Sequence, residues 1–391
     1  MDISDHLIWK QVSAFKKPLH LLRIYLAGQY AKLFSRDIFV GVTGSVGKTT
    51  CVQASKLVLE QKGKTLSTIS NLDPVFNIPI TILKVNPYIR KVILEMGVEY
   101  KGEMDFYLSM VRPKTVIITK LSFAHSEFLG SIEDILAEKG KLVESLPADG
   151  LAILNGDDIY SKKLASKSKA QVIYFGKDPK TATIWAGNIK IRNFKTIFEL
   201  NYGVERVPVE LQLLGEHQIY PVLAAAALGV ANDIPLIKIK HALEKITPEQ
   251  HRLQSLPGPN GSVILDDTYN SSPAAVEGAI DTLLSVPARR RIVVLGEMRE
   301  LGEFSDRLHR QIARKIYSEK IDSVFLGGGE AQIIADELQK LGFLEERLEY
   351  NLQNPQIVSK LLKVLGKGDV CLIKGSRAVR LDEVIIRIVK K

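Results

Sequence analysis

The sequence predicts an α/β protein: a central domain with a doubly wound, mostly parallel sheet, and a C-terminal Rossmann-like α/β domain. Short apolar runs alternate with helical periodicity over residues 37–165, and the same alternation returns after residue 248. A glycine-rich turn between a strand and a helix opens the first of these stretches. Between residues 170 and 215 the apolar runs are short and separated by turn residues, which predicts an antiparallel insert.

The first 36 residues predict a short basic helical segment. Leu19, Leu22, Leu26 and Leu33 fall near one face, with lysines and arginines around them. Two interpretations stay open: this face packs on the neighbouring domain, or it makes peripheral contact with a membrane. The N-terminus lacks the features of a signal peptide, and no window of 18 apolar residues predicts a transmembrane helix.

The turn after the first strand carries the clearest functional signal. Residues 37–40 predict the strand, residues 51–60 predict the helix, and Gly-x-x-Gly-Lys-Thr lies between them. In this context the backbone N–H groups and the helix N-terminus can hold phosphate oxygens, so a turn without such a role is the weaker interpretation. We expect Lys48 to reach the β- and γ-phosphates and Thr49 to hold Mg²⁺. The expected nucleotide-binding residues are Gly44, Ser45, Val46, Gly47, Lys48, Thr49 and Thr50.

Two further strands end in polar residues that can join this site. Glu95 ends the apolar run 91–95, and His125 follows the run 115–119. Because ligands of open parallel sheets lie at the carboxyl ends of the strands, we expect both side chains beside the phosphate loop. A carboxylate there is a natural Mg²⁺ ligand, although either residue alone would more often be structural.

A second α/β unit follows a turn at residues 247–248. A turn-rich hairpin spans residues 256–262, and the strand after it ends in Asp266 and Asp267. Three more apolar strands alternate with helices, at residues 291–295, 323–326 and 370–373. We therefore expect three segments: the basic N-terminal segment 1–36, a central nucleotide-binding domain 37–248 and a C-terminal domain 249–391.

Composition narrows the function classes. A formal net charge of +9 favours an acidic partner such as a nucleotide, a phosphorylated substrate or an anionic membrane, unless it reflects only a lysine-rich surface. No nucleic-acid-binding motif accompanies the charge, so no nucleic-acid partner is expected. Cys51 and Cys371 are too few for a disulfide scaffold or a zinc site, and they predict buried thiols in a reducing, cytoplasmic compartment.

Short motifs follow one another in a fixed order along residues 38–391. They are residues 43–49, 71–79, 95–97 with 102–103, 124–125, Lys139, 155–158, 266–273, 296–302 with His309, and 374–377. Each is weak alone, but together they resemble the Mur ligases, ATP-dependent peptide synthetases of bacterial cell-wall precursors. They are most similar to the member that adds D-alanyl-D-alanine to UDP-N-acetylmuramoyl tripeptide.

The resemblance implies a ligase that activates a carboxylate as an acyl phosphate with ATP and then forms an amide. It implies that Thr49 and Glu95 hold one Mg²⁺, and that His125 holds a second with the help of a carbamylated Lys139. Lys48 completes the implied catalytic group. Arg252 and Asp267 are implied to contact ATP on domain closure, which excludes water from the acyl phosphate. The implied substrate-binding residues are Asn71, Asn270, Lys374, Ser376 and Arg377.

Some positions depart from the family pattern. Lys120 stands where an Asn is usual, and Ser272 replaces another Asn. The family's His-Asn-x-x-Asn becomes His-Gln-Ile-Tyr-Pro at residues 217–221, which loses an Asn expected near the nucleotide. The family also carries a domain for the UDP-sugar before the phosphate loop, and the roughly 40 residues here cannot bury a core of that size. Two acceptors therefore stay open, a UDP-linked muramoyl peptide or another, lipid-linked one.

The partner is accordingly expected to be a small molecule or a peptide-sugar, bound by a monomer. A nucleotide-dependent regulatory protein without catalysis is the alternative class. The presence of Glu95, His125 and Lys139 together argues against it.

Overall fold

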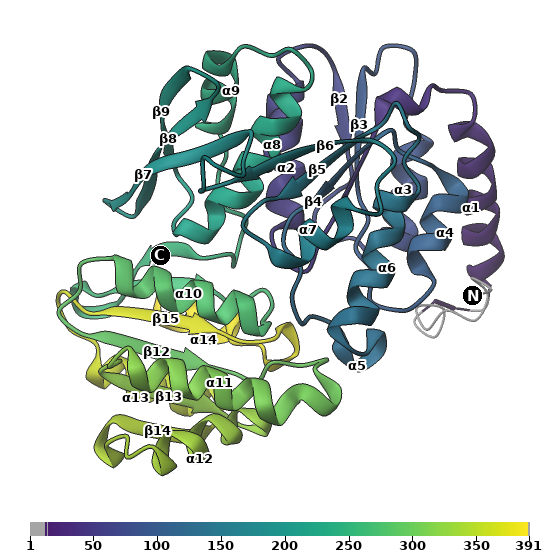
Figure 1. The fold of residues 1–391 in the computed structure, drawn as a ribbon. Coiled ribbons are helices and arrows are strands. Elements are labelled where there is room, and N and C mark those ends of the chain that lie inside the picture. The colour runs from purple at the N-terminus through teal and green to yellow at the C-terminus, as the bar shows by residue number, and fades with distance from the viewer. Residues whose placement is uncertain (1–11, 14, 390–391) are drawn as a thin grey trace.

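The computed structural model describes residues 12, 13 and 15–389, and its strands form two sheets (Figure 1). The central sheet has the order β2-β3-β1-β4-β5-β6-β7-β8-β9, parallel from β2 to β7 and antiparallel from β7 to β9. Its strands are β1 (Phe39–Thr43), β2 (Thr65–Ser67), β3 (Lys91–Glu95), β4 (Thr115–Ile118), β5 (Leu151–Asn155), β6 (Gln171–Gly176), β7 (Ile184–Arg192), β8 (Lys195–Tyr202) and β9 (Glu205–Leu211).

The second sheet has the order β10-β11-β15-β12-β13-β14, and only the β10–β11 hairpin in it is antiparallel. Its strands are β10 (Gln254–Pro257), β11 (Val263–Asp267), β12 (Arg291–Leu295), β13 (Ser323–Gly327), β14 (Leu348–Leu352) and β15 (Val370–Lys374). The predicted fold class, with its antiparallel insert and its second Rossmann-like sheet, is confirmed.

Helices cover both faces of each sheet, and each face has its own apolar core. On the central sheet they are α1 (Lys17–Ala31), α3 (Pro74–Ile82), α4 (Glu103–Met110), α6 (Ile132–Glu144) and α7 (Ile159–Ala165) on one face, and α2 (Lys48–Leu59), α8 (Ile219–Val230) and α9 (Leu236–Leu243) on the other. On the second sheet they are α10 (Pro273–Ser285), α11 (Ser305–Ser318) and α12 (Gln332–Lys340) opposite α13 (Asn354–Val364) and α14 (Asp382–Ile388). No helix among these described residues is both long enough and apolar enough to cross a membrane.

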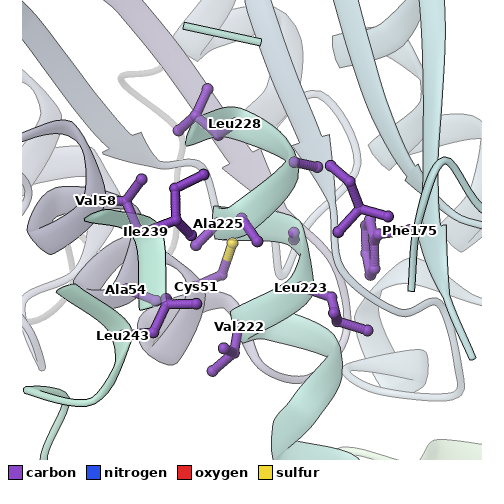
Figure 2. Close-up of a cluster of buried hydrophobic side chains, with 14 of the residues drawn as sticks. Cys51, Ala54, Val58, Phe175, Val222, Leu223, Ala225, Leu228, Ile239 and Leu243 are labelled. Carbon is purple, nitrogen blue, oxygen red and sulfur yellow. The ribbon is translucent and has the colours of Figure 1, made fainter. Parts of the chain in front are cut away.

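The helix after the glycine-rich turn is held by a dense apolar cluster. Figure 2 shows Cys51, Ala54 and Val58 of α2 against the alanine-rich helix α8, with Leu243 of α9 beside them. Small side chains on α8 let the two helices approach closely, and this packing fixes where α2 begins. Burial raises the pKa of the Cys51 thiol to about 12, so it stays protonated. The prediction of two buried cysteines is confirmed.

Helix α1 differs from the sequence-based expectation. Its buried side consists of Ile24, Ala27, Gly28 and Ala31, which face α3 and α4, whereas the predicted leucine face is exposed. The small residues account for this orientation, because they let α1 pack closely: a Cβ atom at Gly28 would lie only 3.6 Å from the backbone of α4. The interpretation that the leucines pack on the domain is therefore wrong. The rest of the predicted segment, residues 1–11 and 14, lies outside the described residues.

Two strands also differ in detail. β1 begins two residues later than predicted, because residues 36–38 form a short 3-10 helix capped by the Ser35 side chain. Within the predicted antiparallel insert, residues 184–192 form one long strand, β7, rather than short ones. Its pairing with β8 is irregular between Gly187 and Lys190, where Asn188 takes a positive φ of 53°.

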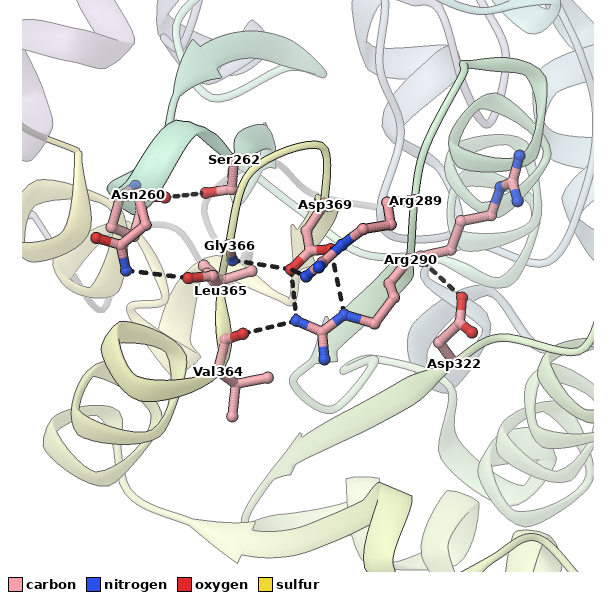
Figure 3. A network of polar contacts seen from close by, with 11 residues as sticks. Asn260, Ser262, Arg289, Arg290, Asp322, Val364, Leu365, Gly366 and Asp369 are labelled. Atoms are coloured by element: carbon pink, nitrogen blue, oxygen red, sulfur yellow. Dashed lines mark hydrogen bonds and ion pairs between the residues drawn. The ribbon is translucent and has the colours of Figure 1, made fainter.

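An ion-pair cluster ties together the amino ends of β12 and β15, at the edge of the second sheet opposite the carboxyl ends of its parallel strands. Asp369 is fully buried and accepts hydrogen bonds from the side chains of Arg289 and Arg290 and from the Gly366 amide (Figure 3). The two guanidinium groups hold the pKa of Asp369 well below its usual range, although burial acts in the opposite direction.

Replacing this carboxylate is expected to destabilise the fold. Asp369→Asn removes the charge that both arginines contact, and we expect a loss of about 2 kcal/mol in the free energy of unfolding, measured by urea denaturation. Glu346→Gln, which removes the charge of an exposed carboxylate, is the control and should leave the unfolding midpoint unchanged. Equal stability of the two variants would contradict a structural role for Asp369.

Candidate functional site

One pocket of about 450 Å³ lies between the two domains, a size typical of small-ligand sites. It is lined by loops that follow β1, β3 and β4 of the central sheet and β11, β12 and β15 of the second sheet. The carboxyl ends of both sets of strands therefore face one space. The predicted site residues in its wall are Ser45, Val46, Gly47, Lys48, Thr49, Thr50, Asn71, Glu95, His125, Arg252, Asp267, Asn270 and Lys374.

The glycine-rich loop is held by the two residues that directly follow strand β4. Thr119 donates a hydrogen bond to the Val46 carbonyl at 2.6 Å, and the Ser45 amide donates to the Lys120 carbonyl at 2.7 Å. A Cβ atom at Gly44 would lie 2.1 Å from Thr119 Oγ1, so only glycine fits this approach. Gly44 is not itself in the wall, but its carbonyl accepts a hydrogen bond from Lys48 Nζ at 3.1 Å.

The loop leads directly into α2, which begins at Lys48 after Gly47 in a left-handed conformation with a φ of 81°. The first amides of a helix have no partner within it, and here they lie beside the pocket. Together with the positive end of the helix dipole they make a site for phosphate oxygens. Burial lowers the pKa of Lys48, and Glu95 acts in the opposite direction.

Thr49 and Glu95 bring two side-chain oxygens together in the wall of the pocket. Thr49 Oγ1 lies 3.3 Å from Glu95 Oε1. The pairing of β1 with β3 places Val42 opposite Glu95 and so brings the carboxylate beside the phosphate loop. No group of three or more His, Cys, Asp or Glu side chains converges on a metal position within the described chain. A hydroxyl and a single carboxylate fit Mg²⁺, which takes its remaining ligands from water and phosphate.

His125 connects the central domain to the C-terminal domain. It stands before the short helix α5 (Ser126–Leu129), and its Nδ1 lies 2.6 Å from Oε2 of Glu300, on the loop after β12. The Glu127 amide donates to the Glu300 carbonyl at 3.0 Å, and Ser126 Oγ donates to the Leu301 carbonyl at 3.1 Å. The hydrogen bond from His125 lowers the pKa of Glu300. One ring nitrogen of His125 is therefore engaged across the domain boundary.

Lys139 lies behind the pocket rather than in its wall. It is fully buried on α6, and its Nζ donates to the Val98 carbonyl at 3.3 Å. Burial, together with the nearby Lys48 cation, lowers the pKa of this amine to about 7. Val98 itself lines the pocket, so the amine lies one residue away from it.

The C-terminal domain presents basic and aromatic groups. The Arg252 guanidinium stacks on the Tyr269 ring at 4.0 Å, while Lys374 Nζ donates to Asp267 at 2.6 Å and to the Asn270 carbonyl at 2.8 Å. The Lys374 amine thereby fixes the loop after β11. These contacts place the Arg252 guanidinium, which also pairs with Glu249, and the Lys374 amine in the wall of the pocket.

Two of the predicted substrate-binding residues are also outside the wall of the pocket. Ser376 Oγ accepts a hydrogen bond from the Arg299 amide at 2.9 Å, and Arg299 does line the pocket. The Arg377 guanidinium lies 5.3 Å from the Tyr269 ring centroid. Neither side chain lines the pocket itself, but each is next to a residue that does.

Tyr269, Arg299 and Glu300 lie within motifs recognised in the sequence, but no role was predicted for any of the three. Tyr220, within the segment 217–221 that departs from the family pattern, also reaches the site. Its hydroxyl donates to Asp157 at 3.1 Å, and the residue lines the pocket. The motif at residues 155–158 therefore reaches the pocket through Tyr220.

Fold and site together define a nucleotide-binding enzyme of two α/β domains with its site between them. The family model of the Mur ligase middle domain matches residues 42–229, and that of the Mur ligase glutamate ligase domain matches residues 251–377. The chain therefore belongs to the Mur ligase family, and the resemblance seen in the sequence is confirmed. As a member of this family it is an ATP-dependent ligase that forms peptide bonds.

Similar proteins come from several bacteria. The UDP-N-acetylmuramoyl-tripeptide–D-alanyl-D-alanine ligase of Escherichia coli K12 is 29% identical over 349 residues, which are 88% of this chain and 75% of that protein. The Bacillus subtilis ligase of the same name is 28% identical over 91% of this chain and 78% of that protein. The structure of MurF from Thermotoga maritima in complex with ADP has a TM-score of 0.82 and 24% identity, covering 94% of this chain and 83% of that one.

Breaking the His125–Glu300 pair is expected to impair the junction of the domains. We expect His125→Ala and Glu300→Ala each to lower the rate of ADP release at least about tenfold, and the double variant to be no slower than the worse single one. Glu303→Ala, on the same loop but exposed, is the matched control. Additive losses would show that the two side chains act independently.

Proposed function

We propose that this ligase joins D-alanyl-D-alanine to a UDP-N-acetylmuramoyl tripeptide in the synthesis of peptidoglycan precursors. The names of the bacterial relatives give this reaction, and their similarity extends over most of the chain. The observation that carries the proposal is the facing arrangement in the pocket: Lys48, Thr49 and Glu95 lie on one side, and Arg252 and Lys374 lie on the other.

The proposed reaction has two steps. A carboxylate oxygen of the peptide attacks the γ-phosphorus of ATP, the bond to the β–γ bridging oxygen breaks, and ADP leaves. The amine of D-alanyl-D-alanine then attacks the acyl carbon, inorganic phosphate leaves, and the amine loses its proton. The loop amides and Lys48 would hold the phosphates in both steps, while Arg252 would offset negative charge from the opposite domain.

Mg²⁺ belongs to this proposal, with Thr49 and Glu95 as its ligands. When bound, it would neutralise charge on the β- and γ-phosphates. We assign the second ion to His125, through the ring nitrogen that does not contact Glu300. The carbamylated Lys139 would support it, because carbamylation converts a cation into an anion.

The burial of Lys139 supports carbamylation. Only a neutral amine reacts with CO₂, and an amine with a pKa of about 7 is largely neutral at pH 8 but mostly protonated at pH 6. At constant dissolved CO₂ we therefore expect carbamate to increase as the pH rises through 7, seen as a ¹³C NMR signal from protein equilibrated with ¹³C-bicarbonate. Lys139→Ala should lose the signal and Lys141→Ala should keep it. A signal that survives in Lys139→Ala would contradict the assignment.

The remaining predicted residues keep their roles as proposals. Asn71 and Asn270 would contact the substrates from the wall of the pocket, and Ser376 and Arg377 would support that wall through Arg299 and Tyr269. We propose that the enzyme acts as a monomer, because one chain supplies both sides of the pocket. A cytoplasmic location fits the two free, buried thiols.

A Mur-type ligase for a lipid-linked acceptor, associated with a membrane, is the second candidate. The exposed leucine face of α1 favours it.

The two candidates are separated by their substrates. Purified protein would be mixed with Mg²⁺-ATP, D-alanyl-D-alanine and UDP-muramoyl tripeptide, and ADP release and product mass would be followed, with Lys48→Ala as the inactive control. We expect ADP release that requires both substrates, and a product with the mass of the pentapeptide. Absence of turnover, in protein that binds ATP, would contradict the UDP-linked acceptor and favour a lipid-linked peptide.

A further inference from the structure

Helix α1 is apolar on two opposite sides, and only one of them is covered. Its small residues face α3 and α4, while Leu19, Leu22 and Leu26 are 58%, 53% and 47% exposed. Phe15, just before the helix, and Leu33, just after it, are 95% and 75% exposed. The spacing of these five residues keeps them on one stripe. Figure 1 shows α1 at the outer edge of the central domain, where a partner can reach this stripe.

Large apolar side chains gathered in this way indicate an interaction surface rather than scattered surface residues. Single exposed apolar residues are common on proteins, but a contiguous stripe along a helix usually has a partner. We call Phe15, Leu19, Leu22, Leu26 and Leu33 the leucine stripe. Within the described part of the chain, no other segment packs over the leucine stripe and buries it.

The charges around the leucine stripe select the partner. By helical periodicity Lys16 and Arg23 lie along one side of it and Lys32 lies along the other. The sequence contains no Asp or Glu between residues 6 and 36, but six lysines and arginines. A second copy of the same helix would bring cations against cations. An anionic surface with an apolar interior satisfies both the stripe and its flanks.

We propose that α1 lies on the surface of a membrane rich in anionic lipids, with the leucine stripe inserted among the acyl chains and the cations at the headgroups. This proposal does not depend on which acceptor the ligase uses. Apolar burial and electrostatic attraction would both contribute, so binding should require anionic lipid and should weaken as the salt concentration rises.

Helix α1 also contacts α3, the helix that leads to the pocket. The His20 ring of α1 packs against the Phe76 ring of α3 in a tilted arrangement, with ring centroids 4.8 Å apart, and the Tyr30 hydroxyl donates to the Val85 carbonyl just after α3. The residues that begin α3, Asp73 and Pro74, line the pocket. One short helix therefore connects the proposed membrane surface to the wall of the active site, so a bound enzyme would hold its pocket near the lipid.

The test is sedimentation of the full chain with vesicles of phosphatidylcholine alone or with one third phosphatidylglycerol. We expect binding only to the anionic vesicles, reduced severalfold between 50 and 500 mM salt, as expected for about three surface cations. The variant Leu19→Ser/Leu22→Ser/Leu26→Ser should lose at least about tenfold in affinity. The variant Lys16→Ala/Lys32→Ala should lose less affinity than the leucine variant. Its difference in affinity from the unchanged protein should shrink at high salt, where the charges are screened.

Matched controls separate the leucine stripe from general stickiness. Ile237→Ser/Leu362→Ser/Ile386→Ser removes side chains that are 47%, 45% and 71% exposed on other helices, and it should bind like the unchanged protein. Lys340→Ala/Lys363→Ala is the corresponding charge control. ADP release in solution should be the same for all variants, which shows that they fold. No binding to anionic vesicles would overturn the proposal. So would a dimer in solution that dissociates in the leucine variant, because a second copy would then cover the stripe.

Discussion

The close approach of the glycine-rich loop to strand β4 is the constraint on which the site depends. The hydroxyl of Thr119 holds the Val46 carbonyl, and this leaves room only for a glycine at position 44. The curled loop then delivers the chain into α2, whose first amides face the pocket and whose apolar side is fixed against α8. A phosphate site made in this way is preorganised, because its donors are held by packing and not by the ligand.

The second constraint is the joining of two sheets at their carboxyl ends. Each sheet alone would offer an open edge of polar loops. The contact between His125 and Glu300, with the backbone hydrogen bonds around it, holds the loops after β4 and β12 together and closes one side of the pocket. Such a junction can exclude water from a reactive acyl phosphate. Hydrolysis of that intermediate by water is the main side reaction of the proposed chemistry.

Local sequence was sufficient for much of this picture, since strand, turn and helix signals lie within short windows. The phosphate loop, the carboxylate at the end of β3 and the second α/β unit were all predicted from such patterns, and the structure places their side chains in one pocket. Glu300 was missed because its partner is 175 residues away, and no local pattern marks a pair that forms only when two domains meet. The interpretation that the leucines of α1 pack on the domain was wrong, because periodicity shows that a face is apolar but not which of two apolar faces the neighbours cover.

A crystal structure of the full chain with Mg²⁺ and a non-hydrolysable ATP analogue tests the central claim most directly. The account predicts phosphates on the amides of residues 44–50, a metal ion bound by Thr49 and Glu95, and Arg252 against the nucleotide from the other domain. Nucleotide bound instead at the glycine-rich turn of residues 327–329, where a second hollow lies beside Glu297 and Asn354, would contradict it.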